Sequence, residues 1–393
     1  RLDPRGPAAR PESDLLLRTS GSTTGTGSLV AMSLTALVAS ARATHARLGG
    51  AGTWVLALPT HHVAGLQVLI RSLVADRAPV VVDAAAGFSP DALADAIERA
   101  VGARPDEPVR VPLVPTQLVR SLAPGQRRAR QALARTDAVL LGGAAADPAL
   151  LERAGAAGVR VVTTYGMSET GGGCVYDGVP LDGVEVRIEN PDADGVGRIV
   201  LSGPVLAAGY AERGTRPASA AVFRRRRRTG SEEPADNRCV PTGAAGWPGA
   251  TVDEPTSCRE LLTSDLGRLV DSTDGVRRLA VLGRADDVII TGGVKVAPRE
   301  VEEALTTLPG IAQACVVGVP DAEWGSAVVA AVVLDSAREV GDRDAWAQRL
   351  RAAARERLDG AHAPKRIVAV EALPLRGPGK VDRRAVQRLF DAG

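Results

Sequence analysis

The sequence predicts an α/β protein with two domains. Short apolar runs alternate with helical patterns along the first part of the chain, and this alternation is typical of mainly parallel sheets flanked by helices. After Pro180 the pattern changes to short β runs, which predicts a small β subdomain. The end of the chain predicts a small α+β arrangement. We therefore expect a large N-terminal domain over residues 1–283 and a small C-terminal domain over residues 284–393.

Composition and charge exclude several classes of protein. The formal net charge is +2, which argues against a general nucleic-acid binder. The four cysteines show neither a CxxC pair nor metal-ligand spacing, so we expect reduced thiols in a cytoplasmic protein. No apolar run reaches the roughly 18 residues of a membrane span, and no signal peptide is evident. The oligomeric state stays open between a monomer and a homo-oligomer.

The beginning of the chain leads into a candidate phosphate-binding loop. The chain starts at Arg1 rather than Met, so we expect a shortened N-terminal domain, either a fragment or a chain with a misplaced start. Residues 1–13 are rich in Pro and Arg and are expected to be disordered. The strand-like run Leu15–Leu17 precedes Thr19–Gly27, whose N–H and hydroxyl groups can surround phosphate oxygens. The loop lacks the Walker pattern, and alone it would suggest a flexible linker.

The rest of the N-terminal domain continues the alternation of strands and helices. Ser33 and Ser89 are suited to cap helices, and Pro90 fits a first helical position. Helices are expected at 33–48, from Pro59 through Leu73, at 89–101, from Pro115 and at 148–154, and strands at 54–58, 79–83, 109–114, 137–141 and 159–162.

Two joints between these elements carry candidate binding residues. His61 and His62 stand at a helix start beside a strand end, where they could line a pocket, although such a pair more often caps a helix or lies satisfied in a core. Gly142, Gly143 and Ala144 follow a buried strand, and glycines let a flat ring approach the backbone closely. A plain strand–turn–helix joint explains these three residues equally well.

The segment Thr163–Thr170, followed by three glycines, is the strongest candidate site. It comes after a short strand, and open α/β sheets bind ligands at the carboxyl ends of their strands. Tyr165 offers a flat face for a base, and Ser168 and Thr170 offer hydroxyls to phosphate oxygens. Glu169 offers a carboxylate to Mg²⁺. So many ligand-type groups in one turn favour a nucleotide site over an ordinary strand end.

Residues 211–263 have no periodicity and include five consecutive arginines, Arg224–Arg228. We expect a disordered, solvated insertion here, or a stretch translated in the wrong frame, because long structureless loops are unusual in compact domains. The arginines could bind nucleic acid or an anionic surface, but we assign them no function.

Order is expected to return at residues 262–267, where Asp265 occupies a turn and could accept hydrogen bonds from a ribose. A surface aspartate is the alternative. Further along, strands are expected at 276–282, 312–319, 326–334 and 367–370, and helices from Pro298 and at 342–358. Lys380 stands after a Gly-rich loop and before a final helix, where an isolated lysine is normally solvated.

Several of these strings resemble the acyl-adenylate-forming (AMP-binding) enzymes. YGMSET resembles their adenine and magnesium motif, and TSGSTTGTG resembles their phosphate loop, TSGSTGxxKG, with one extra residue and no lysine near Gly27. ALPTHHVAGLQ, LVPTQL and YGMSETGGGCVYDGVP are similar to o-succinylbenzoate–CoA ligases of actinobacterial type. The resemblance covers most of residues 14–210 and 262–393, with five separated motifs in the family's order.

The resemblance implies ATP, Mg²⁺ and CoA as cofactors and a small-molecule carboxylic acid as substrate. It implies three catalytic residues, Lys380, Glu169 and Thr170, of which Glu169 binds the metal. His61 or His62 would orient the acid, and Asp286 would be a hinge. The implied cofactor-binding residues are Thr19, Ser20, Gly21, Ser22 and Thr23 for phosphate, Gly142, Gly143, Ala144, Tyr165, Gly166 and Ser168 around the nucleotide, Asp265 and Arg284 for ribose or phosphate, and Gly292 and Gly293 for pantetheine.

The implied reaction is a two-step ligation. A carboxylate would attack the α-phosphate of ATP to give acyl-AMP, and CoA would then displace AMP. The implied acid is 2-succinylbenzoate, in menaquinone biosynthesis. Two alternatives stay open. One is another acyl- or aryl-CoA synthetase. The other is a non-catalytic nucleotide-binding remnant, favoured by the lysine-free phosphate loop and by residues 211–263.

Overall fold

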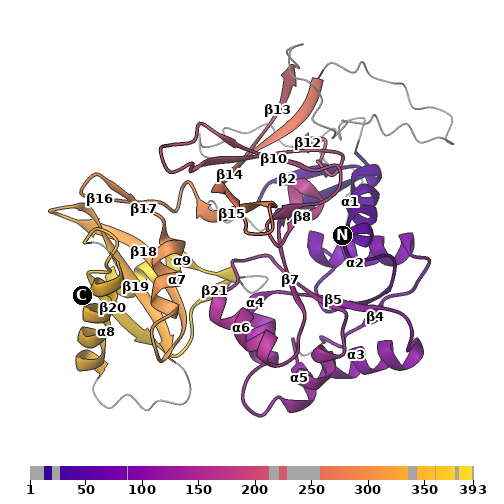
Figure 1. The fold of residues 1–393 in the computed structure, drawn as a ribbon, viewed down its shortest axis with the longest axis horizontal. Coiled ribbons are helices and arrows are strands. Elements are labelled where there is room, and N and C mark those ends of the chain that lie inside the picture. The colour runs from indigo at the N-terminus through magenta and orange to yellow at the C-terminus, as the bar shows by residue number, and fades with distance from the viewer. Residues whose placement is uncertain are drawn as a thin grey trace. The chain divides into compact units, whose positions relative to one another are not determined.

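The computed structural model describes residues 13–19, 27–85, 87–211, 221–227, 257–334, 343–358, 360–376 and 380–391. The chain divides into two compact units, drawn in Figure 1. The first unit contains residues 1–143, 157–264 and 268–280. The second contains residues 144–156, 265–267 and 281–393.

A seven-stranded sheet forms the centre of the first unit. Its order is β4-β3-β5-β6-β7-β8-β9; the strands from β4 to β7 are parallel, and β8 and β9 are antiparallel additions. Every residue of β5 and β6 is buried, which explains the continuous apolar sequence of β6, whereas β5 includes the buried Arg110. The prediction of a mainly parallel sheet in this part of the chain is confirmed. The bounds are β3 Thr53–Leu56, β4 Val80–Val81, β5 Val109–Leu113, β6 Ala138–Leu141, β7 Val161–Met167, β8 Gly172–Tyr176 and β9 Val179–Pro180.

Helices flank this sheet as predicted. Ser33 and Ser89 accept hydrogen bonds from backbone N–H groups three residues on, and so cap α1 and α3. Figure 1 shows α1 and α2 grouped together, apart from α3 and α5. No helix among the described residues is long and apolar enough to cross a membrane. The bounds are α1 Leu34–Arg47, α2 Val63–Val74, α3 Pro90–Ala103, α4 Pro115–Ser121 and α5 Arg127–Ala134.

Two smaller sheets lie wholly or mostly in the first unit, with residues 265–267 and 281–284 of the second sheet assigned to the second unit. One has the order β1-β2-β12, with β1 Leu15–Arg18, β2 Leu29–Met32 and β12 Gly209–Tyr210. The other has the order β10-β11-β14-β13, with β15 paired to β14. Its bounds are β10 Glu185–Glu189, β11 Gly197–Ser202, β13 Val222–Arg227, β14 Ser257–Asp271 and β15 Arg277–Arg284.

The prediction of a disordered insertion over residues 211–263 is wrong for residues 222–227 and 257–263. These residues pair antiparallel, in register from Val222↔Leu262 to Arg227↔Ser257. Leu261 is fully buried, and Arg224 forms ion pairs with Glu189 and Glu260. Long-range pairing and charge neutralisation thus order a strand that has no alternating pattern of its own. Residues 212–220 and 228–256, like residues 1–12, lie outside the described residues.

The second unit is a small α+β body, as predicted. A three-stranded sheet has the order β18-β19-β20, with β18 and β19 antiparallel and β19 and β20 parallel. Residues on one face, such as Val316 and Val328, join a core with Val301, whereas their neighbours Val317 and Val329 join a core with Phe390. The bounds are α6 Pro148–Ala156, β16 Ile289–Thr291, β17 Val294–Val296, α7 Pro298–Thr306, β18 Ile311–Asp321, β19 Gly325–Leu334, α8 Arg343–Arg357, β20 Arg366–Val370, β21 Leu375–Arg376, β22 Lys380–Val381 and α9 Arg383–Asp391.

Candidate functional site

The predicted nucleotide segment lies partly in strand β7. The sequence placed the strand end at residue 162, but β7 continues to Met167 because β8 pairs with it, Tyr165 opposite Val175 and Gly166 opposite Gly173. A Cβ atom at position 166 would lie 2.1 Å from the carbonyl oxygen of Gly172. Only glycine therefore lets the two strands approach this closely. The turn itself shrinks to the short 3₁₀ segment Ser168–Thr170.

The hydroxyl of Thr170 holds this turn together. Its Oγ1 accepts a hydrogen bond from the N–H of Met167 (2.9 Å) and lies 2.7 Å from the carbonyl oxygen of Gly172, to which it donates. The residue is fully buried. Gly171, at φ 61°, closes the turn by donating its N–H to the carbonyl of Ser168 (3.2 Å). The hydroxyl of Thr170 is therefore engaged by the backbone, which gives it a supporting place in the turn.

The carboxylate of Glu169 is the group of the turn best suited to a metal. The residue is 8% exposed, and its Oε1 accepts a hydrogen bond of 2.7 Å from the hydroxyl of Tyr210 in β12. Among the described residues no Lys or Arg pairs with it. Its oxygens have lone pairs beyond the one that Tyr210 uses, and carboxylate oxygens are hard ligands, so the site fits a hard cation such as Mg²⁺. Sequence reasoning missed Tyr210, which lies 41 residues away and carries no local signal.

The base of the phosphate loop is a hairpin in the same small sheet. Thr19 and Ser28 bond to each other twice at 2.9 Å, through the N–H of Thr19 to the carbonyl of Ser28 and the N–H of Ser28 to Oγ1 of Thr19. β2 follows this loop and pairs with β12, which places Tyr210 opposite Val30. The loop base and Glu169 are thus linked through two strands of the first unit. Ser20, Gly21, Ser22 and Thr23 lie outside the described residues.

Gly142 and Gly143 follow β6 and lie beside β7. A Cβ atom at Gly142 would lie 2.2 Å from Oγ1 of Thr164, and that hydroxyl donates to the carbonyl of Leu141 at 3.3 Å. The space above Gly142 is therefore used by a neighbouring side chain. Gly143 has a positive φ of 81°. Ala144 belongs to the second unit.

His61 and His62 stand just before α2. His62 occupies the N-cap position but makes no side-chain cap bond, so the simple capping interpretation does not apply. The two imidazole rings lie 4.2 Å apart, with His61 exposed and His62 half-buried. A Cβ atom at Gly65 would lie 2.3 Å from the carbonyl of Pro59, so the helix start folds tightly on the preceding segment.

Buried cations support the sheet behind this region. The guanidinium of Arg71 lies 4.9 Å from the centre of the Trp54 ring and donates to the hydroxyl of Tyr176 at 3.2 Å. Among the described residues no carboxylate bonds to Arg71. The Trp54 indole N–H donates to Nε2 of His45 at 3.3 Å. Burial, reinforced by the charges of Arg110 and Arg71, lowers the pKa of His45 to about 4, so this imidazole stays neutral as an acceptor.

The second unit brings together Asp265, Arg284 and Asp286. The prediction that Asp265 lies in a turn is wrong, because residues 257–271 form one long strand through pairing with β11, β13 and β15. Arg284 makes a two-fold ion pair with Asp286, with both N···O distances 2.8 Å. Burial acts to lower the pKa of Arg284, but the hydrogen bond and charge of Asp286, with a smaller contribution from Asp265, raise it.

Gly292 and Gly293 form the tip of the β16–β17 hairpin, and both have positive φ angles, 55° and 82°. Gly292 packs against Trp324, since a Cβ atom there would lie 2.4 Å from the indole ring. Lys380 lies in β22, where its backbone pairs with Arg376. The side chain of Lys380 lies outside what the structure describes.

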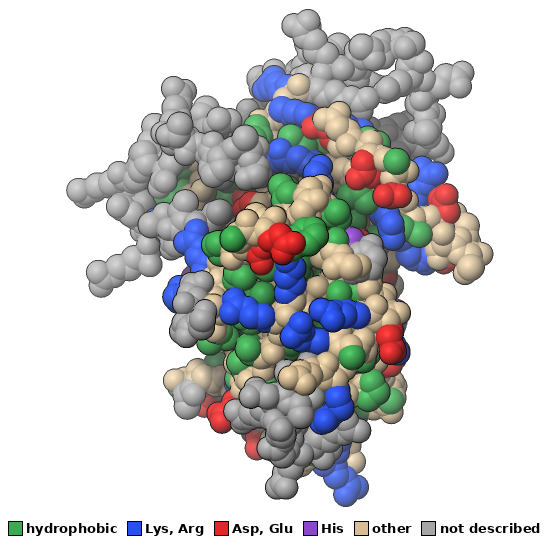
Figure 2. Space-filling model, turned by 90° about the vertical axis from the view of Figure 1, so that its left-hand side faces the viewer, with side chains coloured by type: hydrophobic (Ala, Val, Ile, Leu, Met, Phe, Trp, Pro, Cys, Tyr) green, Lys and Arg blue, Asp and Glu red, His purple; other side chains and the backbone are tan. Residues whose placement is uncertain are grey.

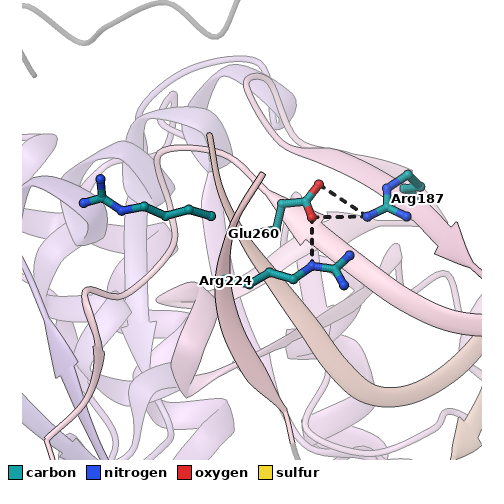
Figure 3. Close-up of a pocket in the computed structure, with 4 residues that line it drawn as sticks. Arg187, Arg224 and Glu260 are labelled. Carbon is teal, nitrogen blue, oxygen red and sulfur yellow. Dashed lines mark hydrogen bonds and ion pairs between the residues drawn. The ribbon is translucent and has the colours of Figure 1, made fainter. Parts of the chain in front are cut away.

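A separate hollow lies on the β-subdomain and contains none of the predicted site residues. It is lined by Arg187, Arg224, Arg225 and Glu260. Figure 3 shows Glu260 between Arg187 and Arg224, to which it forms ion pairs of 3.2 and 3.1 Å. Glu260 is thus already engaged by two of the three arginines, and we assign the hollow no ligand. In Figure 2, basic side chains gather near the middle of the face drawn, with acidic and hydrophobic side chains around them.

Comparisons with known sequences identify the family. A family model described as AMP-binding enzyme matches residues 4–211, and one described as AMP-binding enzyme C-terminal domain matches residues 300–380. A Mycobacterium tuberculosis protein named "Probable 2-succinylbenzoate--CoA ligase" is 42% identical over 376 residues, which are 96% of this chain and 84% of that protein. A feruloyl-CoA synthase from Amycolatopsis sp is 30% identical over 357 residues, 86% of this chain and 61% of that protein.

Solved structures agree with this assignment. An o-succinylbenzoate CoA synthetase from Bacillus subtilis with its acyl-adenylate intermediate has a TM-score of 0.68 and 26% identity, over 95% of this chain and 68% of that chain. The same enzyme with ATP and a magnesium ion gives a TM-score of 0.66 and 26% identity, over 94% and 68%. An amide bond synthetase from Marinactinospora thermotolerans gives 0.69 and 27%, over 93% and 68%. The resemblance seen in the motifs is confirmed: the chain belongs to the AMP-binding enzyme family, whose relatives named above include acid–CoA ligases.

Proposed function

We propose that this chain is an ATP-dependent acid–CoA ligase that converts 2-succinylbenzoate to 2-succinylbenzoyl-CoA through an acyl-AMP, as a step of cytoplasmic menaquinone biosynthesis. The observation that carries the class of reaction is the carboxylate of Glu169, held by Tyr210 at the end of a parallel sheet with no cation paired to it among the described residues. The choice of acid rests on the relative that is 42% identical over 96% of this chain.

Each residue of the turn has a proposed task. Glu169 binds Mg²⁺, which when bound supplies positive charge beside the phosphates. Tyr165 and Gly166 border the adenine, while Thr19 through Thr23 and Ser168 donate to phosphate oxygens. Thr170 supports this geometry by holding the turn. The reaction then depends mainly on positioning and on stabilisation of negative charge.

The remaining predicted residues also have proposed roles. His61 or His62 orients the acid, Asp265 and Arg284 bind the ribose or a phosphate, and Gly292 and Gly293 pass beside the pantetheine of CoA. The domain of residues 284–393 rotates about Asp286 between the two half-reactions. Lys380 stabilises the charge of the carboxylate and the α-phosphate in the first one.

Lys380→Ala tests the last assignment. We expect acyl-AMP formation to fall by at least about 100-fold, since one charged group is lost from the transition state, while thioester formation from supplied acyl-AMP continues. Pyrophosphate release and thiol consumption measure the two steps separately. An equal loss of both steps would contradict the assigned role.

The proposed function itself is tested by pyrophosphate release from Mg·ATP with 2-succinylbenzoate, benzoate or a medium-chain fatty acid, each with and without CoA. Release with 2-succinylbenzoate alone supports both the chemistry and the acid. Release with another acid keeps the class of enzyme and overturns the substrate. If ATP binds but no acid causes release, the chain is a nucleotide-binding remnant, and the phosphate loop without lysine is the first place to look.

A further inference from the structure

We infer that Gln67 is a positioning residue for the proposed metal-binding turn, tying helix α2, which begins beside His61 and His62, to the glycine that closes the turn after Glu169. This inference rests on the proposed function. It deepens that proposal by assigning a mechanical connection between the acid-binding helix and the turn that carries Glu169.

The connection is a short hydrogen bond inside the first unit. The side-chain Nε2 of Gln67 donates to the carbonyl oxygen of Gly171 at 2.6 Å and to that of Leu37 in α1 at 3.3 Å. The side chain is fully buried. Its amide therefore joins α1, α2 and the turn at one point, across 104 residues of sequence between Gln67 and Gly171.

The acceptor is the residue whose conformation sets the turn. Gly171 and Gly172 both have positive φ angles, 61° and 109°, which side chains rarely adopt. A Cβ atom at Gly172 would lie 3.3 Å from Cγ of Gln67, so the stem of Gln67 packs directly against this glycine. Gln67 thus fixes the direction of the Gly171 carbonyl and supports the backbone of Gly172. That backbone in turn accepts the hydrogen bond of Thr170.

Stability alone does not explain a glutamine at this place. Its Oε1 is buried and has no hydrogen-bond partner among the residues that the structure describes. A buried acceptor without a partner is destabilising, and an apolar side chain of similar length would avoid that cost. Exchanging the amide oxygen and nitrogen would place two acceptors against each other at Gly171. Nε2 of Gln67 therefore faces the turn although Oε1 is left without a donor. We expect this arrangement where the turn needs a fixed geometry.

The experiment compares Gln67→Met with the wild type and with Gln387→Met. Methionine preserves the length of the side chain and removes the donor. The control removes a similar bond, from Nε2 of Gln387 in α9 to the carbonyl of Gly318 (3.0 Å), in the second unit. For Gln67→Met we expect the Mg²⁺ concentration that gives half-maximal pyrophosphate release to rise about tenfold, because the buried carbonyls of Gly171 and Leu37 both lose this donor. The control should leave the Mg²⁺ requirement unchanged.

Two further readouts separate positioning from a purely structural role. Amide hydrogen exchange of residues 169–173 should become faster in Gln67→Met than in the wild type and the control. The thermal midpoint should fall by no more than in the control. A lowered midpoint with an unchanged Mg²⁺ requirement would overturn the inference. If the wild type releases no pyrophosphate with any acid, the proposed function fails, and hydrogen exchange then decides alone: unchanged exchange at residues 169–173 refutes the role of Gln67.

Discussion

Two regions carry predicted site residues, and they are held in different ways. The turn around Glu169 in the first unit is fixed by neutral donors, namely the hydroxyls of Tyr210 and Thr170 and the amide of Gln67. The segment around Asp286 in the second unit is fixed by ion pairs, which Arg284 makes with Asp286 and Arg383 makes with Asp287. The first region is buried. The second is partly exposed, at 29% for the side chain of Arg284 and 19% for that of Asp286.

The two kinds of contact give the two regions different rigidity. Buried hydrogen bonds from neutral donors are directional and little screened by salt, so they preserve one geometry. Partly exposed ion pairs contribute little to stability and can break and re-form at small cost. A fixed turn suits the positioning of a metal and phosphates. A segment held by ion pairs suits the rotation that we propose about Asp286.

Arg383, the first residue of α9, makes further ion pairs near the segment around Asp286. Its guanidinium bonds to both carboxylate oxygens of Glu302 (2.8 and 3.2 Å) and donates to the carbonyl of Val316 (2.6 Å). Its Nε also lies 3.5 Å from Asp287. One side chain thus connects the start of α9 with α7, β18 and the residue after Asp286.

Gly166→Ala should have the largest effect, and it should disrupt the turn around Glu169. The new methyl group would lie 2.1 Å from the Gly172 carbonyl, so β7 and β8 must separate. We expect a loss of about 3 kcal/mol in the free energy of unfolding and the loss of ATP binding, measured by denaturant titration and calorimetry. Gly102→Ala is the control, because nothing lies within 4 Å of that position in α3, and it should stabilise slightly. Unimpaired ATP binding by Gly166→Ala would contradict the close approach of the strands.

Lowering the pH should weaken the first unit through His45. Burial holds the pKa of this imidazole at about 4 in the folded chain, against an ordinary value of 6.5. Between these values the unfolded chain binds the proton and the folded chain does not. The contribution of His45 to the free energy of unfolding is therefore fully present above pH 6.5. It falls as the pH drops towards 4 and then levels, with a total loss of about 3 kcal/mol. His45→Gln keeps an acceptor for Trp54 and removes the titration, so its unfolding free energy should decline less between pH 7 and 4.5. Parallel curves for the two proteins would refute this role.

Arg383→Met should lower the free energy of unfolding by an intermediate amount, because it removes the ion pairs of Arg383 with Glu302 and Asp287. It leaves Glu302, whose side chain is 16% exposed, without its partner, and we expect a loss of about 1–2 kcal/mol at low salt. This loss in the free energy of unfolding should be smaller in roughly 0.5–1 M NaCl, because salt screens the interactions between the charged groups. Arg388→Met, on the exposed face of the same helix, is the control. A loss that does not depend on salt would show that packing, and not charge, holds this region.

Asp286→Asn should have the smallest effect on stability and a selective effect on catalysis. The partly exposed pair with Arg284 contributes no more than about 1 kcal/mol. If the segment is the hinge, the ratio of thioester formation to acyl-AMP formation should change severalfold while the thermal midpoint hardly moves. Asp274→Asn, which breaks the ion pair with Arg278 in the first unit, should leave that ratio unchanged. An unaltered ratio in Asp286→Asn would remove the reason for placing the hinge there.

Local signals predicted most of the fold. The caps at Ser33 and Ser89, the apolar run of β6 and the glycines after Thr170 each act within a few residues, so they could be recognised in the sequence. Helix α5 escaped because its buried residues are only Ala129, Ala132 and Leu133 among arginines.

The missed features depend on contacts between distant residues. Tyr210 reaches Glu169, and Gln67 reaches Gly171, only after the sheets have formed. Strand β13 has no alternating pattern, and its ordering depends on pairing with β14 and on the ion pairs of Arg224 with Glu189 of β10 and Glu260 of β14. The extension of β7 through Tyr165 likewise follows from pairing with β8. Such features are properties of the folded chain and leave no pattern in any one segment.

The pairing of β13 with β14 also says where this chain could be re-engineered. Arg227 and Ser257 are register partners, so the two backbones are about 5 Å apart at the point where residues 228–256 leave and return. A two-residue Asn-Gly turn would span that gap. Loop-closure entropy changes by only about 0.6 kcal/mol for each doubling of loop length. The junction therefore offers a place to shorten the chain, to insert a reporter domain or to open new termini by circular permutation, with the ladder of β13 and β14 left intact.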